Sequence, residues 1–220
     1  MRFNTVIFDM DGLLIDSEPY WQEAGMETLQ QFDAALTLEQ YHLTTGLRTK
    51  EWIEFWFSQF KIDMRFAKEA ERTIIHKAIE KIKAQGQAMP GVEYILPFFR
   101  EREFTIGLAT SSPNSLIEVV VEKLGVGDFF DIYSSAETLP YSKPHPRVYL
   151  QCAEQLQISP LQCICFEDSF HGMISVKAAR MKCVIIPASD LYAQPKWGAA
   201  DLKLASLKDF NEESLGFLMQ

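Results

Sequence analysis

Two carboxylates separated by one residue directly follow a short apolar run near the start of the chain. The run spans residues 6–8 (Val-Ile-Phe), and Asp9, Met10, Asp11 and Gly12 come next. Two carboxylates at the end of a buried strand repel each other unless a cation lies between them, which disfavours a purely structural turn. A calcium loop places its glycine later, after a third acidic position. The pattern favours a hard-metal site in which Asp9 can attack phosphorus and Asp11 can donate and accept the proton.

A run of hydroxyl-bearing residues follows a second apolar segment. Thr110, Ser111 and Ser112 precede Pro113. Ser112 and Pro113 predict the N-cap and the first residue of a helix, because serine caps helices well and proline is tolerated at the first helical position. Free backbone N–H groups at a helix start can bind phosphate together with hydroxyl groups. A plain capping sequence is the alternative, and we expect Thr110 and Ser111 to bind phosphate in addition.

A lysine and an acidic pair complete the set of polar groups. Lys143 stands among turn-forming residues in the segment 142–146 (Ser-Lys-Pro-His-Pro). A lone lysine is usually a solvated charge, but this one is held in a turn just before a helical stretch. Glu167 and Asp168 follow another apolar run, and a pair of exposed loop carboxylates is their plain alternative. We expect Lys143 to contact the phosphate and to offset the charge of Asp9.

Together and in this order, the four motifs resemble those of the haloacid dehalogenase superfamily of phosphotransferases, over essentially the whole chain. The resemblance implies that Asp9 forms an aspartyl-phosphate and that Asp11 protonates the leaving group and then activates water. It also implies Mg²⁺ bound by oxygen ligands. The implied metal ligands are the side chains of Asp9 and Asp168 and the backbone carbonyl of Asp11. Glu167 would orient metal-bound water, with direct ligation as the alternative.

The elements that must position these residues alternate along most of the chain. Apolar, β-branched runs are separated by stretches with helical apolar spacing. This alternation predicts an α/β fold with a Rossmann-like parallel sheet and helices on both faces, and such a sheet binds ligands at the carboxyl ends of its strands. The predicted strands are 3–8, 104–109, 132–133, 163–166, 183–186 and 202–204, and the predicted helices include 115–124 and 146–156.

Residues 17–88 interrupt this alternation and contain no clear strand. Apolar residues recur there at every fourth position, as in Phe66, Ala70, Ile74, Ala78 and Ile82. We therefore predict a helical cap domain over 17–88, inserted into a core domain formed by 1–16 and 89–220. A second stripe, Trp52, Trp56 and Phe60, is interpreted as the core of this cap rather than as a sugar-stacking surface.

The segments around the motifs indicate the subgroup. Residues 9–19 and 139–146 are similar to bacterial hexitol-phosphate and 2-deoxyglucose-6-phosphate phosphatases, with β-phosphoglucomutases as the alternative. The mutases typically carry a histidine at the position of Trp21, and an indole neither accepts a hydrogen bond nor titrates. Trp21 therefore favours water as the phosphate acceptor, although it can equally pack the cap against the core. Arg48 lies in a segment that resembles the substrate-contacting cap loop, which predicts substrate binding, with a solvated surface arginine as the alternative.

The composition of the chain indicates which kinds of binding partner to expect. The chain has 220 residues, a net charge of −9 and a hydrophobic fraction of 47%. An acidic surface argues against nucleic-acid binding, and no apolar run approaches the roughly 18 residues of a membrane span. We expect a monomer that acts on a small phosphorylated metabolite. The four cysteines, Cys152, Cys163, Cys165 and Cys183, are predicted to be reduced and buried, which favours the cytoplasm.

One position departs from the family pattern. Where the family usually has Ala-Gly-Met after the acidic motif and its helix, this chain has Ala179, Arg180 and Met181. If that residue adopts a left-handed conformation at the helix end, arginine costs about 1 kcal/mol relative to glycine.

Overall fold

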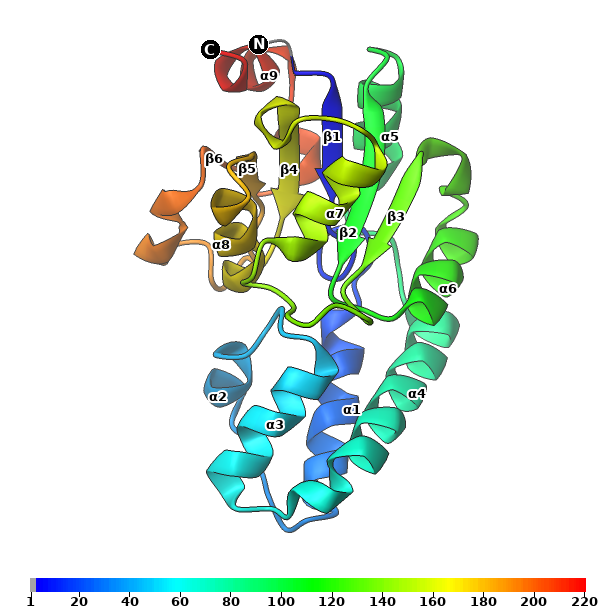
Figure 1. The fold of residues 1–220 in the computed structure, drawn as a ribbon, viewed down its shortest axis with the longest axis vertical. Helices are drawn as coiled ribbons and strands as arrows, with labels where there is room; N and C mark the ends of the chain where they lie inside the picture. The colour runs from blue at the N-terminus through cyan, green and yellow to red at the C-terminus, as the bar shows by residue number, and fades with distance from the viewer. Residues whose placement is uncertain (1–2) are drawn as a thin grey trace.

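The computed structural model describes residues 3–220, which form a six-stranded parallel sheet, helices on both of its faces, and a separate group of helices (Figure 1). A strand lies at each of the six predicted stretches. The strands are β1 (Thr5–Phe8), β2 (Thr105–Thr110), β3 (Ile132–Ser135), β4 (Cys163–Glu167), β5 (Lys182–Ile185) and β6 (Leu202–Lys203). They lie in the order β3-β2-β1-β4-β5-β6 and every neighbouring pair is parallel, which confirms the predicted fold class.

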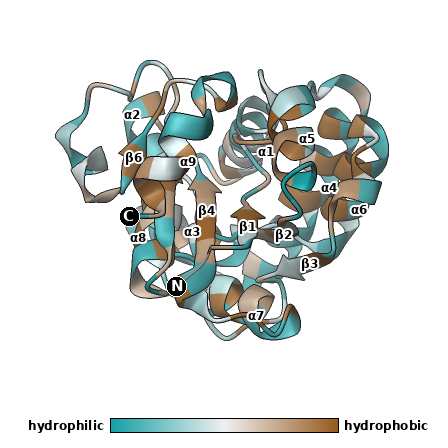
Figure 2. Cartoon of the chain, turned by 90° about the horizontal axis from the view of Figure 1, so that it is seen from above, coloured by the Kyte–Doolittle hydropathy of each residue, from teal (hydrophilic) through white to brown (hydrophobic). Residues whose placement is uncertain are grey.

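The alternation of side chains along the strands creates a core on each face of the sheet. Val6 and Phe8 point to one core and Ile7 to the other, and all three are fully buried. Figure 2 shows largely hydrophobic strands β1 and β4 between helices that carry both hydrophobic and hydrophilic residues. The first face is covered by α5 (Val92–Arg100), α6 (Asn114–Leu124) and α9 (Glu212–Leu218), and the second by α7 (Arg147–Gln155) and α8 (Phe170–Ala178).

Four further helices, which we call the helical unit, lie beyond the carboxyl ends of the strands (Figure 1). They are α1 (Glu18–Gln30), α2 (Leu38–His42), α3 (Thr49–Phe60) and α4 (Ala67–Gln85), and α4 packs against α1 and α3. The chain leaves the sheet and returns to it side by side, since Asp16 N donates to Gln87 O at 2.9 Å and Met89 N to Leu14 O at 2.9 Å. Short 3₁₀ helices lie in the connections, at Met64–Phe66, Gly127–Phe129, Pro160–Gln162, Pro195–Ala199 and Leu207–Asp209.

Two local expectations have different outcomes. The N-cap was predicted at Ser112 and the first helical residue at Pro113, but the N-cap is Pro113 and α6 begins at Asn114, so that prediction is wrong by one residue. The Ser112 hydroxyl is used elsewhere, as described below. Arg180 does adopt the left-handed conformation, with φ of 64°. The arginine therefore carries the backbone strain that a glycine at this position would avoid.

The predicted state of the cysteines is confirmed, since all four are buried and none is in a disulfide. Within residues 3–220, no helix is both long enough and apolar enough to cross a membrane.

Candidate active site

The carboxyl ends of three neighbouring strands bring the predicted polar residues together. Asp9 directly follows β1, Thr110 ends β2 and Glu167 ends β4. Because β2 and β4 flank β1 in parallel register, the ends of all three strands meet at one edge of the sheet. The backbone N–H of Asp9 donates to Phe166 O at 3.0 Å, which fixes its position beside β4. A cavity opens here, and among its lining residues are Asp9, Asp11, Trp21, Thr110, Ser111, Lys143 and Asp168.

Lys143 is buried between two carboxylates. Its Nζ lies 2.6 Å from Asp9 Oδ1 and 2.6 Å from Glu167 Oε1, and it also donates to Ala109 O at 3.2 Å. Burial alone lowers the pKa of Lys143, but the charges of Asp9 and Glu167 outweigh it and raise the pKa above its ordinary value. The side chain is therefore a fixed ammonium ion that offsets the charge of Asp9. Its exposed fraction is 2%, which excludes the solvated lysine.

Glu167 is fully buried, and both of its carboxylate oxygens accept hydrogen bonds. Oε1 accepts from Lys143 and, at 2.6 Å, from the Tyr149 hydroxyl. Oε2 accepts from the backbone N–H groups of Asp168 and Ser169, at 3.1 and 3.2 Å, and from the Ser169 hydroxyl. A carboxylate held by this many donors is oriented rather than free. Gly172 makes this possible, because a Cβ there would collide with the carboxylate.

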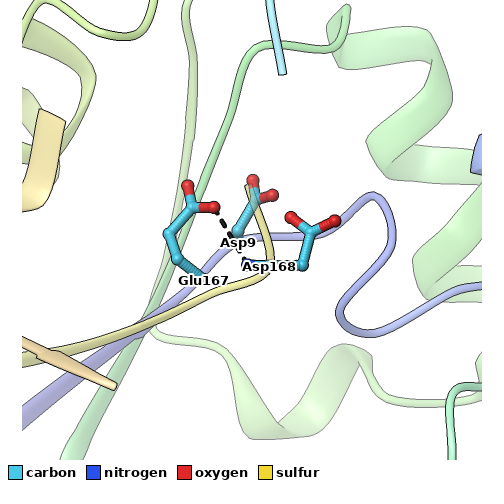
Figure 3. Close-up of side chains that lie close together, drawn as sticks. All are labelled: Asp9, Glu167 and Asp168. Carbon is cyan, nitrogen blue, oxygen red and sulfur yellow. Dashed lines mark hydrogen bonds between the residues drawn. The ribbon is translucent and has the colours of Figure 1, made fainter. Parts of the chain in front are cut away.

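Three carboxylates could hold a metal ion. One oxygen each from Asp9, Glu167 and Asp168 lies within 4.8 Å of the others, as Figure 3 shows. Burial, followed by the neighbouring charge of Glu167, raises the pKa of both Asp9 and Asp168, so the group strongly disfavours three negative charges without a counterion. All three groups offer oxygen atoms as ligands, and the single positive charge of Lys143 leaves the group with a net negative charge. Such a group of ligands fits Mg²⁺. Gly12, at φ of 72°, is required nearby, because a Cβ there would collide with the Asp168 carboxylate.

Asp11 is held by donors from both parts of the molecule. Its Oδ1 accepts from the Ser17 hydroxyl at 2.7 Å and from Trp21 Nε1 at 2.8 Å, both near the start of the helical unit. Its Oδ2 accepts from Thr110 Oγ1 at 3.2 Å, at the end of β2, and from the Ser112 hydroxyl at 2.7 Å, in the loop that follows. The side chain of Asp11 thus stands apart from the three-carboxylate group and faces the hydroxyl groups of the loop after β2.

Thr110 and Ser111, which were predicted to bind phosphate, both line the cavity. Ser111 Oγ donates to Gly46 O of the helical unit at 3.1 Å and accepts from the Ser142 hydroxyl at 2.9 Å. The loop after β2 therefore contacts both the loop that contains Lys143 and the helical unit.

Arg48 is not brought to the cavity. It is buried, and its Nη1 donates to Ala136 O at 2.9 Å and to Leu139 O at 2.7 Å, both in the connection after β3. Its Nη2 lies 3.2 Å from Glu51 Oε1, which also accepts from the Ser142 N–H at 3.0 Å. Arg48 in this structure joins the helical unit to the sheet and is neither a cavity-lining residue nor a solvated one.

Several cavity residues have no counterpart in the sequence motifs. Glu18, Tyr41 and Trp52 come from α1, α2 and α3, and all three line the cavity. Burial, followed by the charges of Asp11 and Asp16, raises the pKa of Glu18 to about 8. Glu18 lies in the segment 9–19 whose resemblance indicated the subgroup, but no role was predicted for it, because an acidic residue at the start of a helix is ordinary.

Comparisons with known proteins identify a family for the chain and relatives that are named as phosphatases. Residues 6–186 match the family profile described as haloacid dehalogenase-like hydrolase. The chain is 38% identical over 210 residues to hexitol phosphatase B of Escherichia coli strain K12, which covers 95% of each chain. It is 26% identical over 188 residues to fructose-1-phosphate phosphatase YqaB of the same organism, which covers 83% of this chain and 96% of that protein.

A solved structure shares the fold. The β-phosphoglucomutase from Clostridium difficile superposes with a TM-score of 0.84 at 23% identity, covering 98% of this chain and 96% of that one. At this identity the likeness concerns the arrangement of sheet and helices rather than the reaction.

Proposed function

The chain belongs to the haloacid dehalogenase-like hydrolases, and from that premise we propose that it hydrolyses a small sugar or polyol phosphate monoester through an aspartyl-phosphate on Asp9. The observation that carries the proposal is the pairing of Asp9 with Lys143 at 2.6 Å inside the lined cavity, beside Asp168. A phosphate dianion repels a carboxylate, and a fixed ammonium ion at this distance reduces that repulsion.

The residues divide the reaction into two steps. In the first, a carboxylate oxygen of Asp9 forms a bond to phosphorus, the ester P–O bond breaks, and the leaving oxygen takes a proton from Asp11. In the second, water attacks the same phosphorus, its proton passes to Asp11, and the bond between Asp9 and phosphorus breaks to release inorganic phosphate. Thr110, Ser111 and Lys143 would bind the phosphate oxygens, since all three line the cavity next to Asp9.

We propose Mg²⁺ as the cofactor. The carboxylates of Asp9 and Asp168 would hold it together with the backbone carbonyl of Asp11, and Glu167 would orient the surrounding water through its fixed carboxylate. A magnesium ion bound there neutralises charge on the phosphate and on Asp9. We also propose that the chain works in the cytoplasm, as its reduced cysteines favour.

The environment of Asp11 supports hydrolysis rather than phosphate transfer between sugars. Trp21 Nε1 donates to Asp11 Oδ1 at 2.8 Å and can only donate. No titrating group stands at this position to retain or release the proton in response to a bound sugar. Asp11 is therefore available to water whenever the phosphoenzyme forms, and this favours a phosphatase over a phosphomutase.

Asp9→Asn tests the nucleophile. The amide cannot form the acyl phosphate, so we expect phosphate release to fall at least about 1,000-fold and the covalent phosphoprotein to disappear from acid-quenched samples. Asp190→Asn, which changes an exposed aspartate away from the cavity, is the matched control and should behave as the unchanged protein. Substantial turnover by Asp9→Asn would exclude Asp9 as the nucleophile.

The same assay, run with Mg²⁺ across sugar and polyol phosphates, tests the reaction type. Hexose, deoxyhexose and hexitol phosphates should release inorganic phosphate, and chelation with EDTA should abolish the release until Mg²⁺ is restored. β-Glucose 1-phosphate with a bisphosphate primer is the discriminating sample. Formation of glucose 6-phosphate without free phosphate would favour the mutase instead.

A further inference from the structure

The helical unit contributes its own wall to the cavity. Glu18 from α1, Tyr41 from α2, Trp52 from α3 and Thr45 from the connection between α2 and α3 all line it. The phosphate must lie next to Asp9 at the strand ends if Asp9 attacks it. This second wall is therefore positioned to contact the part that differs between phosphate esters, the leaving group.

Within residues 3–220, the cavity lining contains one lysine and no arginine. The lysine is Lys143, and its ammonium group already forms ion pairs of 2.6 Å with Asp9 and Glu167. The wall from the helical unit contributes an acidic side chain, Glu18, and no basic one. A second anionic group on a substrate would be desolvated in this cavity without a free cation to compensate its charge, which is unfavourable.

Arg48 is the arginine of the helical unit that lies nearest in sequence to this wall, and its side chain already forms hydrogen bonds within the protein. Arg48 donates from Nη1 to two backbone carbonyl oxygens of the sheet side and pairs through Nη2 with Glu51. Its Nε is buried without a partner among the described residues, but Arg48 does not line the cavity, so its guanidinium group does not face a second phosphate or a carboxylate there. A bisphosphate or a phosphorylated acid would therefore find no partner of opposite charge at the far end of the cavity.

The same wall offers unpaired polar atoms. Trp52 Nε1 and Thr45 Oγ1 are buried and have no hydrogen-bond partner among the described residues. The Trp52 side chain is 7% exposed, and its ring rests on Gly25, where a Cβ would lie only 3.0 Å from the indole. A buried polar group without a partner is costly, and most such groups in folded proteins are satisfied by water or ligand. A hydroxyl group satisfies both a donor such as the indole and an acceptor such as threonine.

We propose that this wall selects an uncharged, hydroxyl-bearing leaving group, with Trp52, Glu18 and Tyr41 as specificity-determining residues, and that it rejects esters carrying a second anionic group. Glu18 and Tyr41 add a carboxyl group and a phenol to this wall, and both groups can bond to hydroxyl groups. The inference rests on the proposed hydrolysis at Asp9 and narrows its substrate class to neutral polyol or sugar monophosphates.

A pair of esters that differ only at the far end tests the charge selection. Sorbitol 6-phosphate carries a CH₂OH group where 6-phosphogluconate carries a carboxylate. We expect kcat/KM for sorbitol 6-phosphate to exceed that for 6-phosphogluconate by about 10-fold or more, measured with Mg²⁺ on the full chain. A smaller ratio would overturn the proposal.

Substitutions in the wall test its role directly. For each variant we compare kcat/KM for two substrates, and this ratio does not depend on the fraction of the variant that is folded. Trp52→Phe removes the N–H, and we expect the ratio of kcat/KM for sorbitol 6-phosphate to that for p-nitrophenyl phosphate to fall about 10-fold. Trp197→Phe is the matched control, because Trp197 is also buried, its Nε1 bonds to Leu191 O, and it does not line the cavity. An unchanged ratio in Trp52→Phe, or an equal fall in Trp197→Phe, would overturn the role of Trp52.

p-Nitrophenyl phosphate, whose leaving group has no sugar hydroxyls, separates this inference from the proposed function. If it is hydrolysed in an Asp9-dependent way while the two six-carbon esters react equally well, only the leaving-group selection fails. If no ester is hydrolysed, the proposed function fails as well.

Discussion

Glu18 is an acidic side chain among other acidic groups, and its environment makes the folded protein sensitive to pH. The groups facing it are Asp11, Asp16, Tyr41 and Asp168. Its pKa is about 8 in the folded chain against an ordinary value of 4.5. Between these values the folded state binds more protons than the unfolded state, so this contribution to stability is complete below pH 4.5 and is lost as the pH rises through 8.

Replacing Glu18 by glutamine should remove this contribution. We expect the metal-free protein to lose stability relative to Glu18→Gln by roughly 1–3 kcal/mol between pH 5 and pH 8.5. Urea unfolding of both proteins in EDTA at several pH values measures the difference. A difference that stays constant over this range would contradict the raised pKa of Glu18.

The residues that carry the proposed chemistry differ in how far sequence identifies them. Asp9, Lys143 and Asp168 lie in motifs at strand ends, so local pattern and order along the chain are enough to select them. Glu18 and Tyr41 are 23 positions apart on different helices, and nothing in either position predicts that both line one cavity. Their arrangement depends on how α1 and α2 pack, which a local pattern does not encode.

At the scale of elements, the end of α8 is one of five places in residues 3–220 where a residue other than glycine has a positive φ. Arg180 is exposed and has φ of 64°, a conformation that glycine adopts without the Cβ penalty. We expect Arg180→Gly to stabilise the chain by about 1 kcal/mol, which raises the melting temperature by about 2–4 °C.

The matched control is a glycine substitution that should change stability in the opposite direction. Arg72 is exposed in the interior of α4, where glycine should destabilise the helix by about 1 kcal/mol. Thermal unfolding of both variants by circular dichroism distinguishes them. A lower melting temperature for Arg180→Gly would indicate that its side chain stabilises the helix end more than the backbone strain costs.

The strands were more predictable than the helix ends. Each strand is a short apolar, β-branched run, and burial on both faces leaves little alternative for such a run in a parallel sheet. The start of α6 was misplaced because Ser112 has a competing use, donating its hydroxyl to Asp11 at 2.7 Å instead of capping the helix. A local capping pattern cannot anticipate a partner about 100 positions earlier in the sequence.

At the scale of the whole molecule, contacts between the helical unit and the sheet side close the cavity. Arg48 bonds to the connection after β3, Ser111 to Gly46, and His171 Nδ1 lies 2.8 Å from Thr45 O. The insertion of a helical unit was predictable from the change in periodicity over residues 17–88. Its closing contacts were not, because most use backbone carbonyl oxygens, which every residue type has. Our boundaries for the two domains stay a prediction.

The position of Arg48 makes two roles distinguishable. An arginine that bound the leaving group would, when replaced, change the ranking of substrates. An arginine that holds the helical unit against the sheet would, when replaced, lower kcat/KM for all esters alike, because an open cavity admits water and misplaces Asp11. We expect the second result for Arg48→Lys, since a single ammonium group cannot reproduce the planar fork that reaches two carbonyls and Glu51 together.

The expected size is a fall of about 10-fold in kcat/KM for sorbitol 6-phosphate and for p-nitrophenyl phosphate, with their ratio unchanged. Arg65→Lys is the matched control, because Arg65 is exposed in the short 3₁₀ helix before α4 and pairs only with Asp63 among the described acidic residues. If Arg48→Lys instead altered the ratio between the two esters, Arg48 would contact the leaving group during turnover, as the sequence pattern predicted. The conformation described here would then be one that the chain leaves when substrate binds.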